Sequence, residues 1–210
     1  MYPVMLDIAG RSCLLVGGGS VALTKAEGLL VAGARVTVVA PHAVPALLEL
    51  GLRGRLVFEQ RPFREDDIAG HALIFAATND EAVNRRVAQA AAQAGTWVNV
   101  ADDALLSSFH LPARLRRGAL QIAIATSGKA PFVARRLRGL LQRLFGPEWA
   151  DWLEAASEFR RTVRALPLSE AERTWRYDAF FAATVGASHL AVRLPGDAEL
   201  RDLASGRAPS

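Results

Sequence analysis

Three consecutive glycines follow a short apolar run near the start of the chain, and their spacing is typical of a turn that binds a dinucleotide. Gly17, Gly19 and Ala22 fit the pattern G-x-G-x-x-G/A. The first glycine permits a tight turn from strand to helix, the second lets the backbone approach a pyrophosphate, and the small third residue lets the helix pack closely on the strand. The helix then offers free N–H groups and its positive dipole end to the phosphates. The residues predicted to bind the cofactor in this turn are Gly17, Gly18, Gly19, Ser20 and Val21.

The end of the second predicted strand bears on which dinucleotide is bound. An acidic residue about 20 positions after the glycines usually holds the adenosine ribose hydroxyls, but here no carboxylate follows that strand before Glu49. The strand end also lacks an arginine that would pair with a 2′-phosphate, so the sequence gives NADP no support. We predict NAD as the cofactor, with groups near Pro41 and His42 lining the adenosine site.

A polar run, Thr78-Asn79-Asp80, follows the fourth predicted strand at its carboxyl end, where sheets of this kind bind ligands. We predict a cofactor contact for Thr78. For the rest of the run the alternative is a structural one, in which Asn79 or Asp80 caps the helix that follows.

The elements that would position these residues alternate between strand and helix. Strands are predicted at residues 13–16, 35–39, 56–59, 72–77 and 97–100, and helices at 20–32, 43–49 and 80–94. This alternation with short connections indicates an α/β fold with a Rossmann-like, doubly wound parallel sheet.

After residue 100 the pattern changes. Two strands at 108–111 and 120–125 precede a helix at 130–145, a second helix begins at Trp149, and Ser169 with Glu172 fits a capping box for a third. The stretch from Pro195 onward is expected to be frayed. We predict an NAD-binding domain at 1–111, a strand–strand–helix dimerisation and connector region at 112–147, and a small helical C-terminal domain at 148–210.

Composition narrows the class of protein. The 210 residues are 51% hydrophobic, enough for a sizeable core, but no apolar run approaches the roughly 18 residues of a membrane span. The N-terminus lacks the pattern of a secretory signal. Cys13 is the only cysteine, which excludes an internal disulfide and a multi-cysteine metal site. We expect a cytoplasmic protein with no membrane partner.

Charge is unevenly distributed, although the formal net charge is only +4. No acidic residue lies between Asp103 and Glu148, a stretch that carries Arg114, Arg116, Arg117, Lys129, Arg135, Arg136, Arg138 and Arg143. Such a field attracts a polyanion, which means nucleic acid, anionic lipid or a small molecule with many carboxylates. The alternative is an ordinary solvated helix face. Nucleic acid is disfavoured as a partner because the basic residues interleave with an apolar face and lack exposed aromatic residues for stacking on bases.

Seven colinear blocks of the sequence carry a family resemblance. They are Val16–Ala22, Gly33–Pro41, Ala76–Asn84, Val98–Asp103, Phe109–Ala113, Arg117–Gly128 and Pro131–Arg136. Together they resemble the precorrin-2 dehydrogenase/sirohydrochlorin ferrochelatase family, the N-terminal module of siroheme synthases. The resemblance implies oxidation of precorrin-2 to sirohydrochlorin with NAD in siroheme biosynthesis, by a homodimer. Some members also insert ferrous iron to give siroheme, and the sequence leaves open whether this chain does so. One departure is Thr24-Lys25, where the family often has Arg-Lys.

The resemblance also implies roles for individual residues. Asp102, in the Asn-Val-x-Asp run, is the expected catalytic carboxylate, because dehydrogenation releases a proton that a nearby base can take. Asp103 is the competing candidate, and a solvated turn is the structural alternative for both. The residues expected to bind the carboxylates of the tetrapyrrole are Thr126, Arg117 and Lys129. A hydroxyl at Thr126 can instead cap the helix beginning near residue 130. No metal site on the protein is expected, since the tetrapyrrole supplies its own nitrogens.

A protein of another class stays open beside the enzyme. The same sheet could serve a non-catalytic regulator that binds a dinucleotide or a tetrapyrrole. Substitution of Asp102 separates the two hypotheses, because only an enzyme loses turnover while its cofactor affinity survives.

Overall fold

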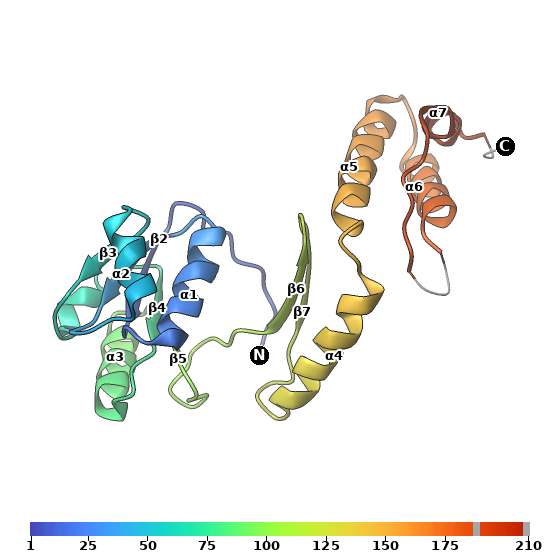
Figure 1. Cartoon of the computed structure of the whole chain (residues 1–210). Helices are drawn as coiled ribbons and strands as arrows, with labels where there is room; N and C mark the ends of the chain where they lie inside the picture. The colour runs from blue at the N-terminus through green and yellow to red at the C-terminus, as the bar shows by residue number, and fades with distance from the viewer. Residues whose placement is uncertain (187–189, 208–210) are drawn as a thin grey trace. The chain divides into compact units, whose positions relative to one another are not determined.

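The chain forms two compact units, Met1–Leu111 and Pro112–Ser210, in the computed structural model of Figure 1. The structure describes residues 1–186 and 190–207. Each unit is considered by itself below. The predicted further division of the second unit near residue 147 stays a prediction.

The first unit is built on a parallel sheet of five strands. They are β1 (Ser12–Val16), β2 (Arg35–Val39), β3 (Val57–Glu59), β4 (Leu73–Ala76) and β5 (Trp97–Val100), in the spatial order β3-β2-β1-β4-β5. The central strand β1 pairs with β2 on one side and β4 on the other. The direction of winding reverses between β1 and β4, and the carboxyl end of this switch point is where such sheets bind ligands. The predicted Rossmann-like α/β fold is confirmed.

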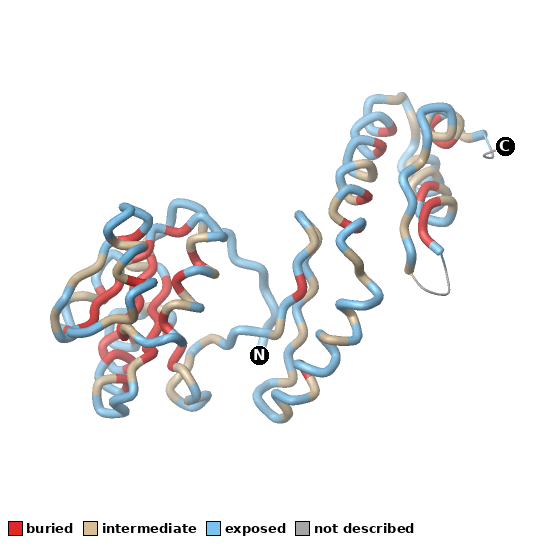
Figure 2. Tube along the Cα trace, in the orientation of Figure 1, coloured by how far each residue is buried: buried red, intermediate tan, exposed pale blue. Residues whose placement is uncertain are grey.

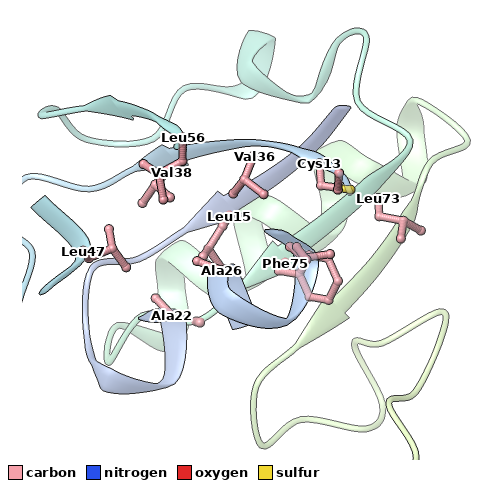
Figure 3. Close-up of a cluster of buried hydrophobic side chains, with 13 residues drawn as sticks. Cys13, Leu15, Ala22, Ala26, Val36, Val38, Leu47, Leu56, Leu73 and Phe75 are labelled. Carbon is pink, nitrogen blue, oxygen red and sulfur yellow. The ribbon is translucent and has the colours of Figure 1, made fainter. Parts of the chain in front are cut away.

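Helices cover both faces of this sheet. They are α1 (Ser20–Val31), α2 (Pro45–Leu52), α3 (Glu81–Gln93) and the short 3₁₀ helix η1 (Glu65–Ile68). Cys13 and Leu15 of β1 pack with α1 and α2, as Figure 3 shows around Ala22, Ala26 and Leu47. The alternate residues of β1 pack instead with α3 and η1. Because both faces are covered, the central strands β1 and β4 are apolar at nearly every position. Figure 2 shows buried residues gathered at the centre of this unit.

The second unit begins with an antiparallel hairpin, β6 (Ala113–Arg117) and β7 (Leu120–Ile124), against which α4 (Pro131–Leu144) packs. Three further helices follow: α5 (Trp149–Ala165), α6 (Glu170–Thr184) and α7 (Asp197–Ser205). Their core contains Trp152, whose indole Nε1 donates a hydrogen bond of 3.0 Å to the hydroxyl of Thr184. Ser169 and Glu172 form the predicted capping box at the start of α6. No helix within residues 1–186 and 190–207 has the length and apolar character needed to cross a membrane.

The prediction of a strand at 108–111 is wrong. These residues fold back on β5, where Ser108 donates its backbone N–H to the carbonyl of Val98 and its hydroxyl oxygen accepts the N–H of Val98, both at 2.8 Å. Pro112 follows directly, and the next strand, β6, begins only at Ala113. The segment is a loop that Ser108 ties to the edge of β5, and it pairs with no strand of its own.

The expectation that the chain is frayed from Pro195 onward is also wrong for the residues described there. α7 occupies most of that stretch and buries Leu203 and Ala204 in the helical core. The Arg193 guanidinium pairs with Glu199 in the first turn of α7 at 2.6 Å. Tertiary burial and this pair stabilise a helix that the local sequence only weakly indicates.

Candidate functional site

Three loops meet at the glycine turn, at the carboxyl ends of β1, β2 and β4. Gly17 has φ +125°, and a Cβ at this position would lie 2.3 Å from the carbonyl oxygen of Ala77, beyond β4. A Cβ at Gly18 would lie 2.0 Å from the carbonyl oxygen of His42, beyond β2. Both contacts are with backbone atoms, so no side chain fits at either glycine. The glycines are required here by the packing of loop against loop.

The start of α1 is open in a way that fits a pyrophosphate. Gly19 is the N-cap residue and has no side chain to cap the helix. A Cβ added at this position would have no protein atom within 4 Å, so the space in front of the helix is open. The first turn has no acidic residue. In the part of the chain that the structure describes, the N–H groups of Ser20 and Val21 have no acceptor. Uncapped N–H groups, the positive dipole end and absent negative charge together suit an anion.

Pro41 and His42 form the neighbouring rim, directly after β2. Both residues are exposed, and the loop is fixed to the glycine turn because Val44 donates its N–H to the carbonyl of Gly18 at 2.8 Å. Gln60 donates its side-chain amide to the carbonyl of Pro41. This rim therefore lies beside the turn, where the adenosine of a dinucleotide would extend. Their role as cofactor contacts stays a prediction.

Thr78 is next to the glycine turn, but its hydroxyl makes internal bonds. It donates to Asn84 Oδ1 at 2.8 Å and accepts the N–H of Asp80. Asp80 caps α3 by accepting the N–H groups of Ala82 and Val83, as the structural alternative expected. Any contact of Thr78 with a cofactor would have to share this hydroxyl.

Asp102 lies just beyond β5, at the same edge of the sheet as the glycine turn. Its φ is +60°, a left-handed conformation that costs free energy for a residue with a Cβ but is best tolerated by aspartate and asparagine. Its side chain is exposed, and within the described residues its carboxylate forms no hydrogen bond. The carboxylate is thus available to a ligand.

The loop that carries Asp102 is locked to β5 by side chains. The hydroxyl oxygen of Ser107 accepts the N–H of Val100 at 2.9 Å, and the same hydroxyl donates to the carbonyl of Asp103 at 2.7 Å. The carboxylate of Asp103 accepts the N–H groups of Leu105 and Leu106 at 2.9 and 3.0 Å. Of the two candidate acids, Asp103 is therefore occupied in forming the turn, whereas Asp102 has a free carboxylate.

Two residues beside this loop were not singled out from the sequence as site residues. Lys25 on α1 donates from Nζ to Asn99 Oδ1 at 2.9 Å, and Asn99 on β5 donates from Nδ2 to the carbonyl of Phe109 at 3.0 Å. Burial lowers the pKa of the Lys25 ammonium group, and the charge of Asp102 acts in the opposite direction. The sequence signals were the place of Lys25 in the Thr24-Lys25 pair and a polar residue, Asn99, in an otherwise apolar strand.

The three predicted substrate-binding residues lie in the second unit and differ in availability. Lys129 is exposed in the loop before α4. The hydroxyl oxygen of Thr126 accepts the N–H of Ala130, the residue before α4, at 3.3 Å. This contact resembles the helix cap that was the structural alternative for Thr126. Arg117 donates from Nε to the carbonyl of Phe145 at 2.8 Å and also to the carbonyl of Gln142, which ties β6 to the end of α4. A substrate carboxylate would have to compete with these carbonyls for its guanidinium group.

Two family patterns match the chain. The family described as "Putative NAD(P)-binding" matches residues 4–113 of the 210 residues. The chain belongs to this NAD(P)-binding family. Its predicted cofactor, a nicotinamide adenine dinucleotide, is thereby confirmed. A second family, described as "Sirohaem biosynthesis protein central", matches residues 117–144, which cover β7, α4 and the last residue of β6.

Relatives of this chain by sequence similarity are siroheme synthases. One from Neisseria meningitidis serogroup C is 39% identical over 188 residues, covering 88% of this chain and 39% of that protein. One from Methylococcus capsulatus is 37% identical over 198 residues, covering 94% of this chain and 41% of that protein. The chain therefore spans about two fifths of the length of these relatives.

A solved structure is similar over its whole length. It is that of SirC, precorrin-2 dehydrogenase, with a TM-score of 0.76 at 28% sequence identity, and the match covers 98% of both chains. Together with the two family patterns, this match confirms the resemblance to precorrin-2 dehydrogenases and siroheme synthases that the seven sequence blocks indicate.

Proposed function

We propose that this protein oxidises precorrin-2 to sirohydrochlorin with NAD, as a step in siroheme biosynthesis. The observation that carries the proposal is the arrangement at one edge of a single sheet. A dinucleotide turn without side chains lies at the end of β1, and a carboxylate free of internal bonds lies beyond β5. The similarity to siroheme synthases and to a precorrin-2 dehydrogenase supplies the substrate.

The chain's own residues have distinct tasks in this reaction. Backbone N–H groups at Ser20 and Val21 bind the pyrophosphate and so fix the cofactor against β1. Bound NAD supplies the hydride acceptor. Asp102 accepts the proton that the substrate loses with the hydride, so that two hydrogens leave in all. A general base of this kind contributes about 10²- to 10⁴-fold to the rate. The locked loop holds the backbone of Asp102 in place before substrate binds, which reduces the cost of ordering the site.

The basic second unit supports a substrate with many carboxylates. In addition to Lys129 and Arg117, its exposed arginines include Arg135, Arg136 and Arg138 on α4. A positive field of this kind raises the local concentration of a polyanion and its rate of association. We propose Thr126, Arg117 and Lys129 as direct contacts of the substrate carboxylates.

Homodimerisation is part of the proposal. The β6–β7 hairpin has only two strands, and a two-stranded sheet is marginal unless its edges are covered. α4 also exposes Phe132, Leu137, Leu140 and Leu144. A second copy of the chain that covers these surfaces would bury them. Light scattering after gel filtration is expected to give twice the 22.5 kDa chain mass, and a monomer at micromolar concentration would exclude this part.

Iron insertion would be a second reaction of the same protein. Residues 1–186 and 190–207 contain no cluster of three or more His, Cys, Asp or Glu side chains suited to holding a metal. In such a reaction ferrous iron is a substrate, received by the tetrapyrrole nitrogens.

The buried free thiol of Cys13 is consistent with a cytoplasmic location, where thiols stay reduced.

The test is to supply precorrin-2 and NAD without oxygen, follow NADH and sirohydrochlorin by absorbance, and then add ferrous iron. Asp102→Asn is the decisive variant, because asparagine tolerates the left-handed backbone and the loop should be preserved. We expect turnover to fall at least about 100-fold with unchanged NAD affinity. Asp66→Asn, at an exposed carboxylate in η1, is the matched control.

The alternative, a non-catalytic regulator that binds a dinucleotide or a tetrapyrrole, predicts another result. A regulator would bind the ligands without forming NADH, and the wild-type protein and Asp102→Asn would behave alike. Loss of less than about threefold in Asp102→Asn would exclude the assigned proton acceptor even if the protein is a dehydrogenase.

A further inference from the structure

Gln60 is an exposed residue directly after β3, and its side chain is bound to the rim where the adenosine of a dinucleotide would extend. Its Nε2 donates a hydrogen bond of 3.3 Å to the carbonyl of Pro41, in the loop after β2. Because a carbonyl oxygen only accepts, this contact requires the amide nitrogen on that side and leaves Oε1 on the other. In the described part of the chain, Oε1 and the second N–H of this amide have no partner.

The direction of the cofactor across the sheet follows from the two halves of the proposed site. The pyrophosphate is assigned to the start of α1, directly after the central strand β1, whereas the proton acceptor Asp102 lies beyond the edge strand β5. The nicotinamide must therefore lie on the β4–β5 side of β1, and the adenosine on the side of β2 and β3. Neighbouring strands are about 4.8 Å apart, so β3 ends about 10 Å from β1. Gln60 thus lies where the adenine base is expected.

The charged residues on either side of Gln60 are engaged with each other. Arg61 pairs with Glu59, and its guanidinium group also donates to Asp67 of η1 at 2.7 Å. Within the described ranges Gln60 forms no hydrogen bond to another side chain. It is therefore the member of these three neighbours that a ligand can engage without breaking an ion pair.

An amide oxygen next to a free N–H is complementary to one edge of adenine. The 6-amino group of adenine donates and its ring N7 accepts, so a glutamine carboxamide can pair with both at once. A hypoxanthine base carries an oxygen at position 6 instead, and this oxygen would face Oε1 of Gln60 with no proton between them.

We infer that Gln60 is a specificity-determining residue that recognises the adenine base of the cofactor. Its Oε1 accepts a hydrogen bond from the 6-amino group, one N–H donates to the ring nitrogen, and the other N–H remains on the carbonyl of Pro41. This inference rests on the proposed binding of NAD and extends it from the pyrophosphate to the base.

The test measures the Kd values of NAD and of nicotinamide hypoxanthine dinucleotide by titration calorimetry, without substrate. These dinucleotides differ only in the base, so the ratio of the two Kd values reports base recognition. The wild type should prefer NAD at least about fivefold, the lower end for a bidentate contact with a base. Gln60→Met keeps the length of the side chain and removes both hydrogen-bonding groups, so the ratio should approach one. Because Gln60 is exposed, the melting temperature should not change.

The matched control is Gln93→Met, at an exposed glutamine that ends α3, which should keep the wild-type ratio. A purely structural role predicts another result. If Gln60 only holds the loop at Pro41, Gln60→Met weakens the binding of both dinucleotides alike and leaves the ratio unchanged, which would overturn the inference. Equal affinity of the wild type for the two dinucleotides would also overturn it.

His42 is the second exposed side chain on this rim that can form hydrogen bonds with a base. A ratio that is lost in His42→Ala but kept in Gln60→Met would assign base recognition to His42 and overturn the inference. The proposed function fails separately. A wild type that prefers NAD through Gln60 but does not oxidise precorrin-2 would overturn the dehydrogenase and support the role of Gln60.

Discussion

Replacing Gly19 with alanine tests whether the open backbone at the start of α1 is a pyrophosphate site. Gly19 has φ −83° and ψ −174°, a conformation open to any L residue, and an added Cβ would meet no protein atom within 4 Å. The free energy of unfolding should therefore fall by only about 0.5–1 kcal/mol, the difference between glycine and alanine at an N-cap. The new methyl group would instead stand where the pyrophosphate has to approach the backbone.

The expected loss of affinity follows from the bonds that this approach allows. A hydrogen bond to a charged group is worth about 1.5–3 kcal/mol. If the methyl group prevents even one such bond from the N–H groups of Ser20 or Val21, the Kd for NAD should rise about 10- to 150-fold. Titration calorimetry with NAD and urea unfolding of the same preparation measure the two quantities.

Gly17→Ala is the matched control, because the same methyl group has the opposite effect there. Its φ of +125° and the 2.3 Å approach to the Ala77 carbonyl oxygen force the backbone to move. Backbone strain and overpacking each cost about 1–3 kcal/mol, so this variant should lose stability first. If Gly19→Ala binds NAD within twofold of the wild type, the turn is not the pyrophosphate site and the reasoning fails.

Three further predictions concern stability, pH and substrate binding. Thr184→Val leaves the buried indole N–H of Trp152 unpaired and should cost about 1–3 kcal/mol in urea unfolding followed by tryptophan fluorescence. Burial raises the pKa of Asp67, but its hydrogen bonds and charge pairing with Arg61 outweigh this and hold the pKa below its usual value. A lowered pKa means that this stability is present above the unfolded-state value of about 3.9 and is lost as pH falls through the lower folded-state pKa. Asp67→Asn should therefore be less stable than the wild type at pH 6, and the difference between the two urea midpoints should shrink as pH falls below about 3.9. Lys129→Ala should raise the KM for the tetrapyrrole about two- to tenfold at low salt, with a melting temperature that does not change, because Lys129 is exposed.

The sheet and the glycine turn could be predicted because their signals are local. Each strand of a covered parallel sheet is a short apolar run, and the turn is marked by residues whose side chains are absent. The predicted strands 35–39 and 97–100 agree with β2 and β5 to the residue. The prediction of a strand at 108–111 was wrong because these residues form a loop that Ser107 and Ser108 bind to β5, and four residues are too few for local sequence to distinguish the two cases.

What could not be predicted depends on contacts between residues distant in sequence. Lys25 and Asn99 are 74 positions apart, and nothing in either local sequence indicates their hydrogen bond. The guanidinium group of Arg117 reaches Phe145, 28 positions away, although its charge suggested a substrate contact. Composition gives the charge of a side chain, whereas its partner is decided by tertiary structure.

The two halves of the candidate site should therefore respond differently to mutation. The cofactor half consists of backbone. The affinity for NAD should therefore survive substitutions elsewhere that leave Gly17, Gly18 and Gly19 unchanged and the N–H groups of the turn free. The proposed catalytic half depends on a loop that side chains hold, so a change at Ser107 or Asp103, which lock this loop, can displace Asp102 without touching a ligand. Variants of the turn should then change the Kd for NAD. Variants of the loop around Asp102 should lower kcat and leave the Kd for NAD unchanged.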